Sequence, residues 1–269
     1  MRYPARTCVV ALFAAISFTA TPADLAAQAV SGQALESRDP GNSNPGEQVA
    51  AASIRGLLGQ TVEDFKQLPS LQNLAILTVG GIGASIGHAM DHDITNAMSK
   101  SAGLGGVLHA GETVGGARTQ FAAAVATYTI GRISGSNKVA VIGSDLIRAQ
   151  IVTQTLTAGI KLSVGRTRPD GTMYSFPSGH SSVTFATATV LQRNLGWKVG
   201  LPAYGLATYV AASRVQVKRH FLSDVAFGAA LGIVAGRSVT VGHGDARFAV
   251  SPAPAPGGAA VAFTWLGKN

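Results

Sequence analysis

The sequence predicts an all-α protein, a bundle of six or more helices packed on one another. Three observations favour this class: apolar segments of helical length recur between short breaks, hydrophobic residues make up 46% of the 269 residues, and only 13% are charged. This content is ample for a buried core and excludes disorder of the whole chain. It is typical of densely helical soluble proteins and of membrane-associated proteins alike.

The first 29 residues are typical of an export signal. Arg2 and Arg6 precede an apolar stretch from Cys8 to about Ala20, and Ala27-Gln28-Ala29 supplies an A-x-A cleavage site. We therefore expect a signal peptide over residues 1–29 and a mature protein in the periplasm or another extracytoplasmic space. The alternative is an uncleaved anchor with inner-membrane association, although the apolar stretch is short for a membrane span.

The next segments predict a linker and then the helices. Residues 30–47 contain two Pro-Gly pairs and no hydrophobic period, which predicts a disordered linker. From Gln48 to Lys66 apolar residues recur at three- and four-residue spacing, as on one face of a helix, and Pro69 stops that helix. A helical domain over residues 48–245 is completed by apolar segments at about 71–98, 121–133, 139–160, 181–195, 201–215 and 221–236.

None of these segments offers the roughly 18 consecutive apolar residues of a membrane span. The longest uncharged stretch, residues 67–87, opens with polar residues and a proline, and Asp145 and Arg148 interrupt the segment at 139–160. We therefore expect a soluble or peripheral bundle, with an integral membrane protein as the alternative. Gly228-x3-Gly232-x3-Gly236 indicates close helix packing in either case.

The C-terminal segment, residues 246–269, departs from the helical pattern. Residues 247–250 and 260–265 are short β-tolerant runs on either side of a stretch rich in proline and glycine. They predict a small hairpin or an extended arm.

The basic residues favour a concentrated anion site over a nucleic-acid surface. The net charge is +8, but no run of five basic residues occurs and aromatic residues make up only 6%. A groove that stacks nucleic-acid bases is therefore not expected. Several cations gather instead in one part of the sequence: Lys161, Arg166, Arg168, Arg214, Lys218 and Arg219.

Three sequence blocks carry the chemistry: Lys161-x6-Arg168-Pro169, Pro177-Ser178-Gly179-His180 and Ser213-Arg214-x5-His220-x3-Asp224. Together they supply cations, two histidines and a carboxylate, which is what cleavage of a phosphate ester without a metal requires. The second block precedes an apolar helical run, so its serine can cap that helix. The helix N-terminus can then receive an anion.

His220 and Asp224 are four residues apart, so on a helix they share one face. The carboxylate can accept a hydrogen bond from one ring nitrogen, which fixes the tautomer and leaves the other nitrogen free to attack phosphorus. The pair alone is weak evidence, because helical contacts of this kind are common. Ser213-Arg214 at the right distance before it strengthens the interpretation.

The three blocks, in this order, resemble the signature of the type 2 phosphatidic acid phosphatase (PAP2) and vanadium haloperoxidase superfamily. The resemblance covers about residues 115–236. It implies a PAP2-type helical bundle, and a phosphatase without metal or other cofactor that hydrolyses phosphate monoesters or diphosphates through a phosphohistidine. The implied substrate is a lipid phosphate, a polyprenyl diphosphate, a lipid A phosphate or a soluble monoester.

The resemblance also assigns roles to eight residues. It implies that His220 is the nucleophile, that Asp224 orients it and that His180 is the general acid. The implied phosphate-binding residues are Lys161, Arg168, Ser178, Gly179 and Arg214. Two alternatives stay open: a haloperoxidase, in which vanadate occupies the phosphate seat and coordinates His220, and a helical protein that binds an anion without catalysis.

Two features outside this set have ordinary explanations. Arg166, two residues before Arg168, is expected to be a solvated loop charge, with a contribution to the anion site as the alternative. His88, Asp91, His92 and Asp93 could hold a divalent metal, but the sequence lacks a third spaced ligand block, so a polar helix end is the expected interpretation.

Overall fold

The computed structural model describes residues 54–240, 246–255 and 258–267. The predicted signal peptide and linker lie outside these residues. The chain divides into two compact units, and each is described by itself. The helices belong to one unit, and residues 248–265 belong to the other.

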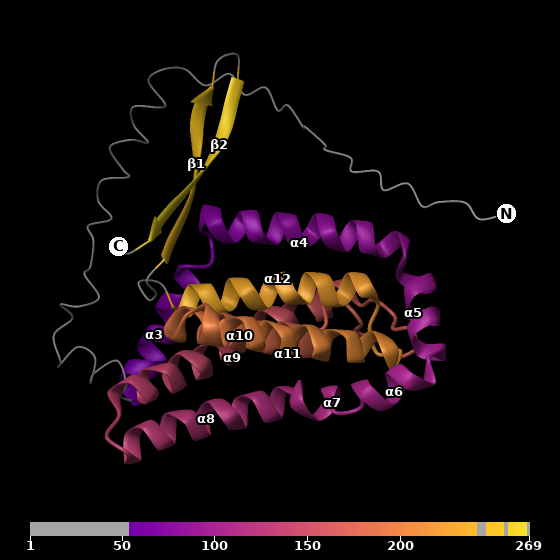
Figure 1. Ribbon diagram of the computed structural model, residues 1–269, viewed down its shortest axis with the longest axis horizontal. Helices are drawn as coiled ribbons and strands as arrows, with labels where there is room; N and C mark the ends of the chain where they lie inside the picture. Colours follow the sequence, from indigo (N-terminus) through magenta and orange to yellow (C-terminus); the bar gives the residue numbers. More distant parts are fainter. Residues whose placement is uncertain (1–53, 241–245, 256–257, 268–269) are drawn as a thin grey trace. The chain divides into compact units, whose positions relative to one another are not determined.

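The helical unit confirms the all-α prediction (Figure 1). Its described helices are α3 (Ile54–Lys66), α4 (Leu71–Ala89), α5 (Asp91–Lys100), α6 (Ala102–Leu108), α7 (Gly111–Val114), α8 (Ala117–Ile133), α9 (Asn137–Val164), α10 (Gly179–Leu195), α11 (Trp197–Gln216) and α12 (Leu222–Val239).

The predicted helix over 71–98 is wrong in one respect, because the chain breaks at Met90. The backbone of Met90 is not helical, with φ −107° and ψ 2°, and its N–H closes the end of α4 by donating to the Gly87 carbonyl. Asp91 then begins α5, which turns away from the direction of α4 (Figure 1). The short helices α6 and α7 lie in a glycine-rich stretch without a strong hydrophobic period and were not predicted.

Helices α10 and α12 pack very closely, as the glycine spacing predicts. A Cβ atom on Gly228 would lie 2.7 Å from the Ser178 carbonyl oxygen, and one on Gly232 would overlap the Ser182 carbonyl oxygen. Further along, a Cβ on Gly236 would meet Thr189. Because contact positions advance together along both helices, α10 and α12 run parallel and begin at the same end.

A buried ion-pair cluster joins the first helix to the core. Arg148 on α9 donates from Nη1 to Asp64 on α3 at 2.6 Å and from Nη2 to Asp145 at 2.5 Å. The Nη2 atom also donates to the Val239 carbonyl at the end of α12, at 2.9 Å. Because all three side chains are buried, losing one partner would leave a charge uncompensated.

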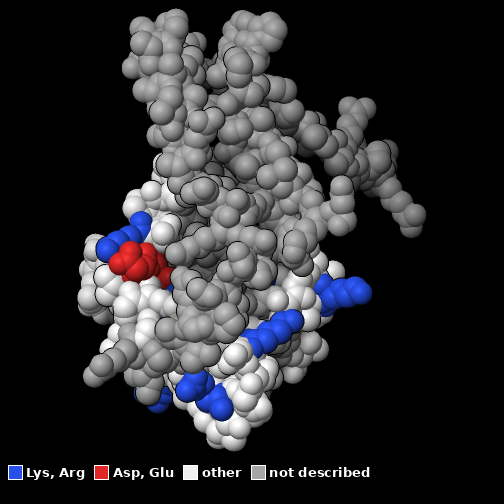
Figure 2. Space-filling view, turned by 90° about the vertical axis from the view of Figure 1, so that its left-hand side faces the viewer, with Lys and Arg blue, Asp and Glu red and all other residues white. Residues whose placement is uncertain are grey.

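Two outer helices expose apolar faces. Helices α4 and α8 flank the bundle on opposite sides (Figure 1). Their exposed large apolar residues are Leu71, Leu74, Val79, Ile82 and Ile86 on α4, and Phe121, Val125, Ile130 and Ile133 on α8. Figure 2 draws a different face, the left-hand side of Figure 1, where the coloured lysine and arginine side chains stand apart and an acidic group lies beside one of them.

Among the described residues, α12 is the single helix that is long and apolar enough to cross a membrane by itself. Its 18-residue window is 67% buried inside the bundle, as in a core helix. The bent pair α3 and α4, which meets at 68°, passes the same test when it is counted as one span. Length and composition therefore give weak evidence for a spanning protein.

The other unit contains most of strands β1 (Ala246–Ala255) and β2 (Gly258–Gly267). They form a two-stranded sheet, the hairpin rather than the extended arm of the two alternatives that the sequence left open.

Candidate active site

The eight predicted site residues lie at the ends of α9 and α11, at the beginnings of α10 and α12, and in the adjoining loops. One backbone hydrogen bond joins the second block to the third, and another lies within the third block. The Ser178 N–H donates to the Asp224 carbonyl at 3.0 Å, and the His220 N–H donates to the Arg214 carbonyl at 3.2 Å. In the first block, the Lys161 Nζ donates at 2.6 Å to the carbonyl of Tyr174, in the loop that leads into the second block.

The beginning of α10 is shaped to receive an anion. Ser178 is its N-cap residue and is fully buried, and its Oγ accepts a hydrogen bond from the Ser181 N–H at 3.4 Å. Gly179 and His180 follow in the first turn, where backbone N–H groups lack acceptors within the helix. Because α12 begins at the same end, two helix dipoles direct their positive ends toward this region.

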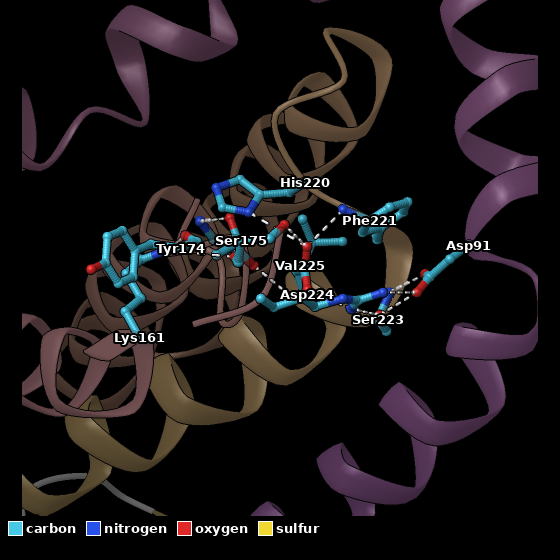
Figure 3. Close-up of polar contacts among 12 residues, drawn as sticks. Asp91, Lys161, Tyr174, Ser175, His220, Phe221, Ser223, Asp224 and Val225 are labelled. Atoms are coloured by element: carbon cyan, nitrogen blue, oxygen red, sulfur yellow. Dashed lines mark hydrogen bonds and ion pairs between the residues drawn. The ribbon is translucent and has the colours of Figure 1, made fainter. Parts of the chain in front are cut away.

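His220 and Asp224 lie beside each other but are not hydrogen-bonded. His220 is 3% exposed, and its Nδ1 is 3.7 Å from Asp224 Oδ2 and has no hydrogen-bond partner among the described residues (Figure 3). Asp224 Oδ2 accepts from the Phe221 N–H at 2.8 Å and from Ser175 Oγ. The carboxylate is therefore held in place before the histidine contacts it.

The ionisation states suit a nucleophile and its orienting carboxylate. Burial lowers the pKa of His220, so its ring is neutral at pH 7. Burial raises the pKa of Asp224, but hydrogen bonds and the nearby Arg166 outweigh it and hold the pKa below its usual value. The pair therefore consists of a neutral imidazole and a carboxylate.

His180 and Lys161 are both destabilised in their charged forms. Burial lowers the pKa of His180 to about 4, and the positive Arg214 acts in the same direction. Burial, together with the charge of Arg168, lowers the pKa of Lys161 to about 8. A bound dianion would counteract these effects, because an opposite charge nearby favours the protonated form.

The two arginines differ in their surroundings. Arg214 is 2% exposed; its Nε donates to Ser213 Oγ at 3.2 Å, and its Nη1 lies 3.7 Å from the carboxylate of the exposed Glu112. Arg168 lies in a tight loop whose backbone bonds join Arg168 and Thr172 at 2.7 Å, and its buried Nε has no hydrogen-bond partner among the described residues. Each guanidinium group can donate hydrogen bonds to two phosphate oxygens at once.

The prediction that Arg166 is a solvated loop charge is wrong. Its side chain is only 20% exposed, and its Nη1 donates to Asp224 Oδ1 and Ser223 Oγ, each at 2.7 Å. Ser175 was missed altogether as a support of Asp224. The position of Arg166 two residues before Arg168 was a usable signal, whereas nothing in the local pattern marked Ser175.

The cluster at 88–93 serves hydrogen bonding in this structure. Asp91 begins α5 and is fully buried, and it faces Arg166 and Ser223, whereas the His88 side chain is 70% exposed. Within the described part of the chain, no three His, Cys, Asp or Glu side chains lie close enough together to hold a metal ion.

Comparisons with known proteins agree with this architecture. Residues 142–247 match the model of the PAP2 superfamily. The first transmembrane PAP2 type phosphatidylglycerolphosphate phosphatase of Bacillus subtilis shares the fold, with a TM-score of 0.51 and 23% identity over 63% of this chain and 94% of that one.

Two curated relatives match part of the chain. Lipid A 1-phosphatase of Porphyromonas gingivalis is 39% identical over 97 residues, which are 35% of this chain and 22% of that protein. Decaprenylphosphoryl-5-phosphoribose phosphatase of Mycobacterium tuberculosis is 36% identical over 107 residues, which are 36% of this chain and 59% of that protein. The chain thus spans less than two thirds of either relative's length.

Proposed function

The chain carries a PAP2 superfamily domain over residues 142–247, and on this premise we propose that it is a metal-independent phosphatase acting through a phosphohistidine. One observation carries the proposal. The neutral, buried His220 lies beside an ionised Asp224, at the end of the bundle where two helices begin and the predicted phosphate-binding cations gather.

In the proposed reaction the phosphoryl group binds at the beginning of α10. The first-turn N–H groups of that helix and the cations Lys161, Arg168 and Arg214 surround its oxygens. Negative charge spreads over the equatorial oxygens in the transition state, so fixed cations around them lower the barrier.

The Nε2 atom of His220 attacks phosphorus, and the bond from phosphorus to the leaving oxygen breaks. His180 donates a proton to that oxygen, and Asp224 accepts a hydrogen bond from Nδ1 as the ring becomes positive. Water then attacks the phosphohistidine and gives its proton to His180. The P–N bond breaks, and inorganic phosphate and neutral His220 are restored.

We assign a lipid-linked phosphate as the substrate class. The two curated relatives are named for lipid A and decaprenyl-linked substrates. In the chain itself, α4 carries no charged residue from Leu71 to Gly87, and α8 has arginines only near its ends, at Arg118 and Arg132. Such faces are suited to lipid contact, because an exposed apolar surface this extensive is unfavourable in water.

The loop before α10 supports the same class. Met173 and Tyr174 are 52% and 44% exposed, and Tyr174 lies directly beside Lys161. An apolar chain attached to the phosphate could lie along these residues. We therefore propose a membrane-associated enzyme in the extracytoplasmic space, where the predicted signal peptide would direct it.

The test is phosphate release by the full chain in detergent micelles with excess chelator. Substrates are a prenyl phosphate, phosphatidylglycerol phosphate, lipid A and p-nitrophenyl phosphate. His220→Ala is the test variant, and His109→Ala, an exposed histidine outside the site, is its matched control. We expect release from lipid substrates that only His220→Ala abolishes. Equal release by His220→Ala would overturn the phosphohistidine, and no release from folded protein would overturn the phosphatase.

A further inference from the structure

Arg166 bridges two buried carboxylates from distant parts of the chain. Its Nη1 donates to Asp224 Oδ1 on α12 and its Nη2 donates to Asp91 Oδ2 on α5, both at 2.7 Å. Both carboxylates are at most 1% exposed, so the guanidinium is their shared counter-charge. Only a planar group with donors on two nitrogens can span the pair in this way.

Asp91 also holds the beginning of α12. Its Oδ1 accepts from the Ser223 N–H at 2.9 Å and its Oδ2 accepts from Ser223 Oγ at 2.6 Å (Figure 3). Ser223 lies in the first turn of α12, where an N–H lacks an acceptor within the helix, so Asp91 supplies the missing acceptor. The next residue along the chain is Asp224.

Arg166 is fixed on its other side by the residue that follows His220. Its guanidinium carbon lies 4.4 Å from the centre of the Phe221 ring, a cation–π contact. The Phe221 N–H in turn donates to Asp224 Oδ2. Asp224 therefore has Oδ1 held by Arg166, while Oδ2 faces His220 Nδ1.

We propose that Arg166 and Asp91 are positioning residues that aim Asp224 at His220. This proposal rests on the proposed function. Without Arg166 the Asp224 carboxylate can rotate, and two buried carboxylates lose their counter-charge. Without the charge of Asp91, Arg166 and the first turn of α12 lose their anchor. Asp91 precedes the residues that match the family model, so a segment outside that match completes the support of the site.

The first experiment compares Asp91→Asn with Asp93→Asn, an exposed position on the same helix. With p-nitrophenyl phosphate we expect Asp91→Asn to lower kcat by up to about 10²-fold, because a small misplacement of a catalytic group can cost that much, while KM changes little. Asp93→Asn should stay near wild type. Circular dichroism and the melting temperature establish that each variant is folded.

The second experiment is chemical rescue. Arg166→Gly should lose activity and regain part of it in millimolar guanidinium, whereas wild type and Asp91→Asn should not gain. A fold defect alone would not respond to the added cation. Arg166→Lys, which keeps the charge but reaches one carboxylate, should show an intermediate kcat.

The outcomes separate the two proposals. Full activity of folded Asp91→Asn overturns the positioning role, while the phosphatase stands. If Arg166→Gly does not fold, Arg166→Lys takes its place, and full activity of Arg166→Lys has the same meaning. Absence of rescue in folded Arg166→Gly also overturns it. Wild-type protein that releases no phosphate overturns the phosphatase, and the positioning role with it.

Discussion

The Nδ1 atom of His220 lies 3.7 Å from Asp224 Oδ2, a separation longer than a hydrogen bond, although three other groups already hold the carboxylate. The acceptor is thus fixed and the imidazole has to approach it. Positive charge on the ring during attack on phosphorus would draw Nδ1 toward Oδ2. Hydrogen bonds in substrate-free sites commonly tighten in this way when substrate binds.

Asp224→Asn should lower kcat by on the order of 10³-fold, because an amide can present a donor to Nδ1 and so favour the wrong tautomer. Initial rates with p-nitrophenyl phosphate measure this effect. Asp93→Asn, at an exposed position on α5, is the control and should lose little. A similar loss in both variants would contradict the orienting role.

His180→Ala should discriminate between leaving groups. The general acid matters most when the departing alcohol is basic, so we expect a loss of about 10²- to 10⁴-fold with an alkyl phosphate and a much smaller loss with p-nitrophenyl phosphate. Steady-state kcat/KM for the two substrates measures the difference. Equal losses would indicate that His180 binds phosphate without donating a proton.

The pH dependence should follow from the pKa of His180, which burial lowers to about 4. The protonated form in free enzyme declines as pH rises above that value. After each kcat/KM is corrected for the second phosphate ionisation of its own substrate, the ratio of the value for the alkyl phosphate to that for p-nitrophenyl phosphate should therefore fall with rising pH, because the alkyl leaving group depends more on protonated His180. A corrected ratio that does not change between pH 4 and 7 would contradict this assignment.

Lys161 predicts a second pH effect, in phosphate binding. Because its pKa is lowered to about 8, its positive charge is lost as pH rises through that value, and inhibition by phosphate should weaken. Arginine stays charged there, so the ratio of the phosphate inhibition constant of wild type to that of Lys161→Arg should rise between pH 7 and 9. A constant ratio would show that Lys161 does not contact the anion.

Gly232→Ala tests the close packing of α10 and α12. The added methyl group overlaps the Ser182 carbonyl oxygen, so we expect destabilisation of about 1–3 kcal/mol or more. Gly159→Ala on α9 is the control, because a Cβ there meets nothing within 4 Å and helix propensity should stabilise by up to about 1 kcal/mol. Thermal unfolding in detergent measures the change in stability of each variant. The prediction would be contradicted if Gly159→Ala were destabilised and Gly232→Ala were not.

The sequence predicted the helices well where apolar periodicity was strong and local. It missed the break at Met90, because the apolar residues of α4 continue to the edge of α5 without a proline between them. It also predicted the close approach of α10 and α12, since glycine spacing is itself a local signal.

The site was predicted in part for the same reason. The three blocks are short motifs, so their residues could be named, and the structure brings them together. Arg166 and Asp91 could not be paired in advance, because 75 residues separate them and only the tertiary fold joins them. The sequence alone therefore could not show that the charge of Arg166 is paired with buried carboxylates.

The parallel contact between α10 and α12 has a consequence for engineering. Both helices begin at the site and are joined along their lengths by backbone contacts, so the relative placement of His180 and Asp224 is set inside the bundle. The outward faces of α4 and α8 do not take part in that contact. Their exposed leucines, isoleucines and valines could therefore be replaced by charged residues to obtain a detergent-free form with the same site.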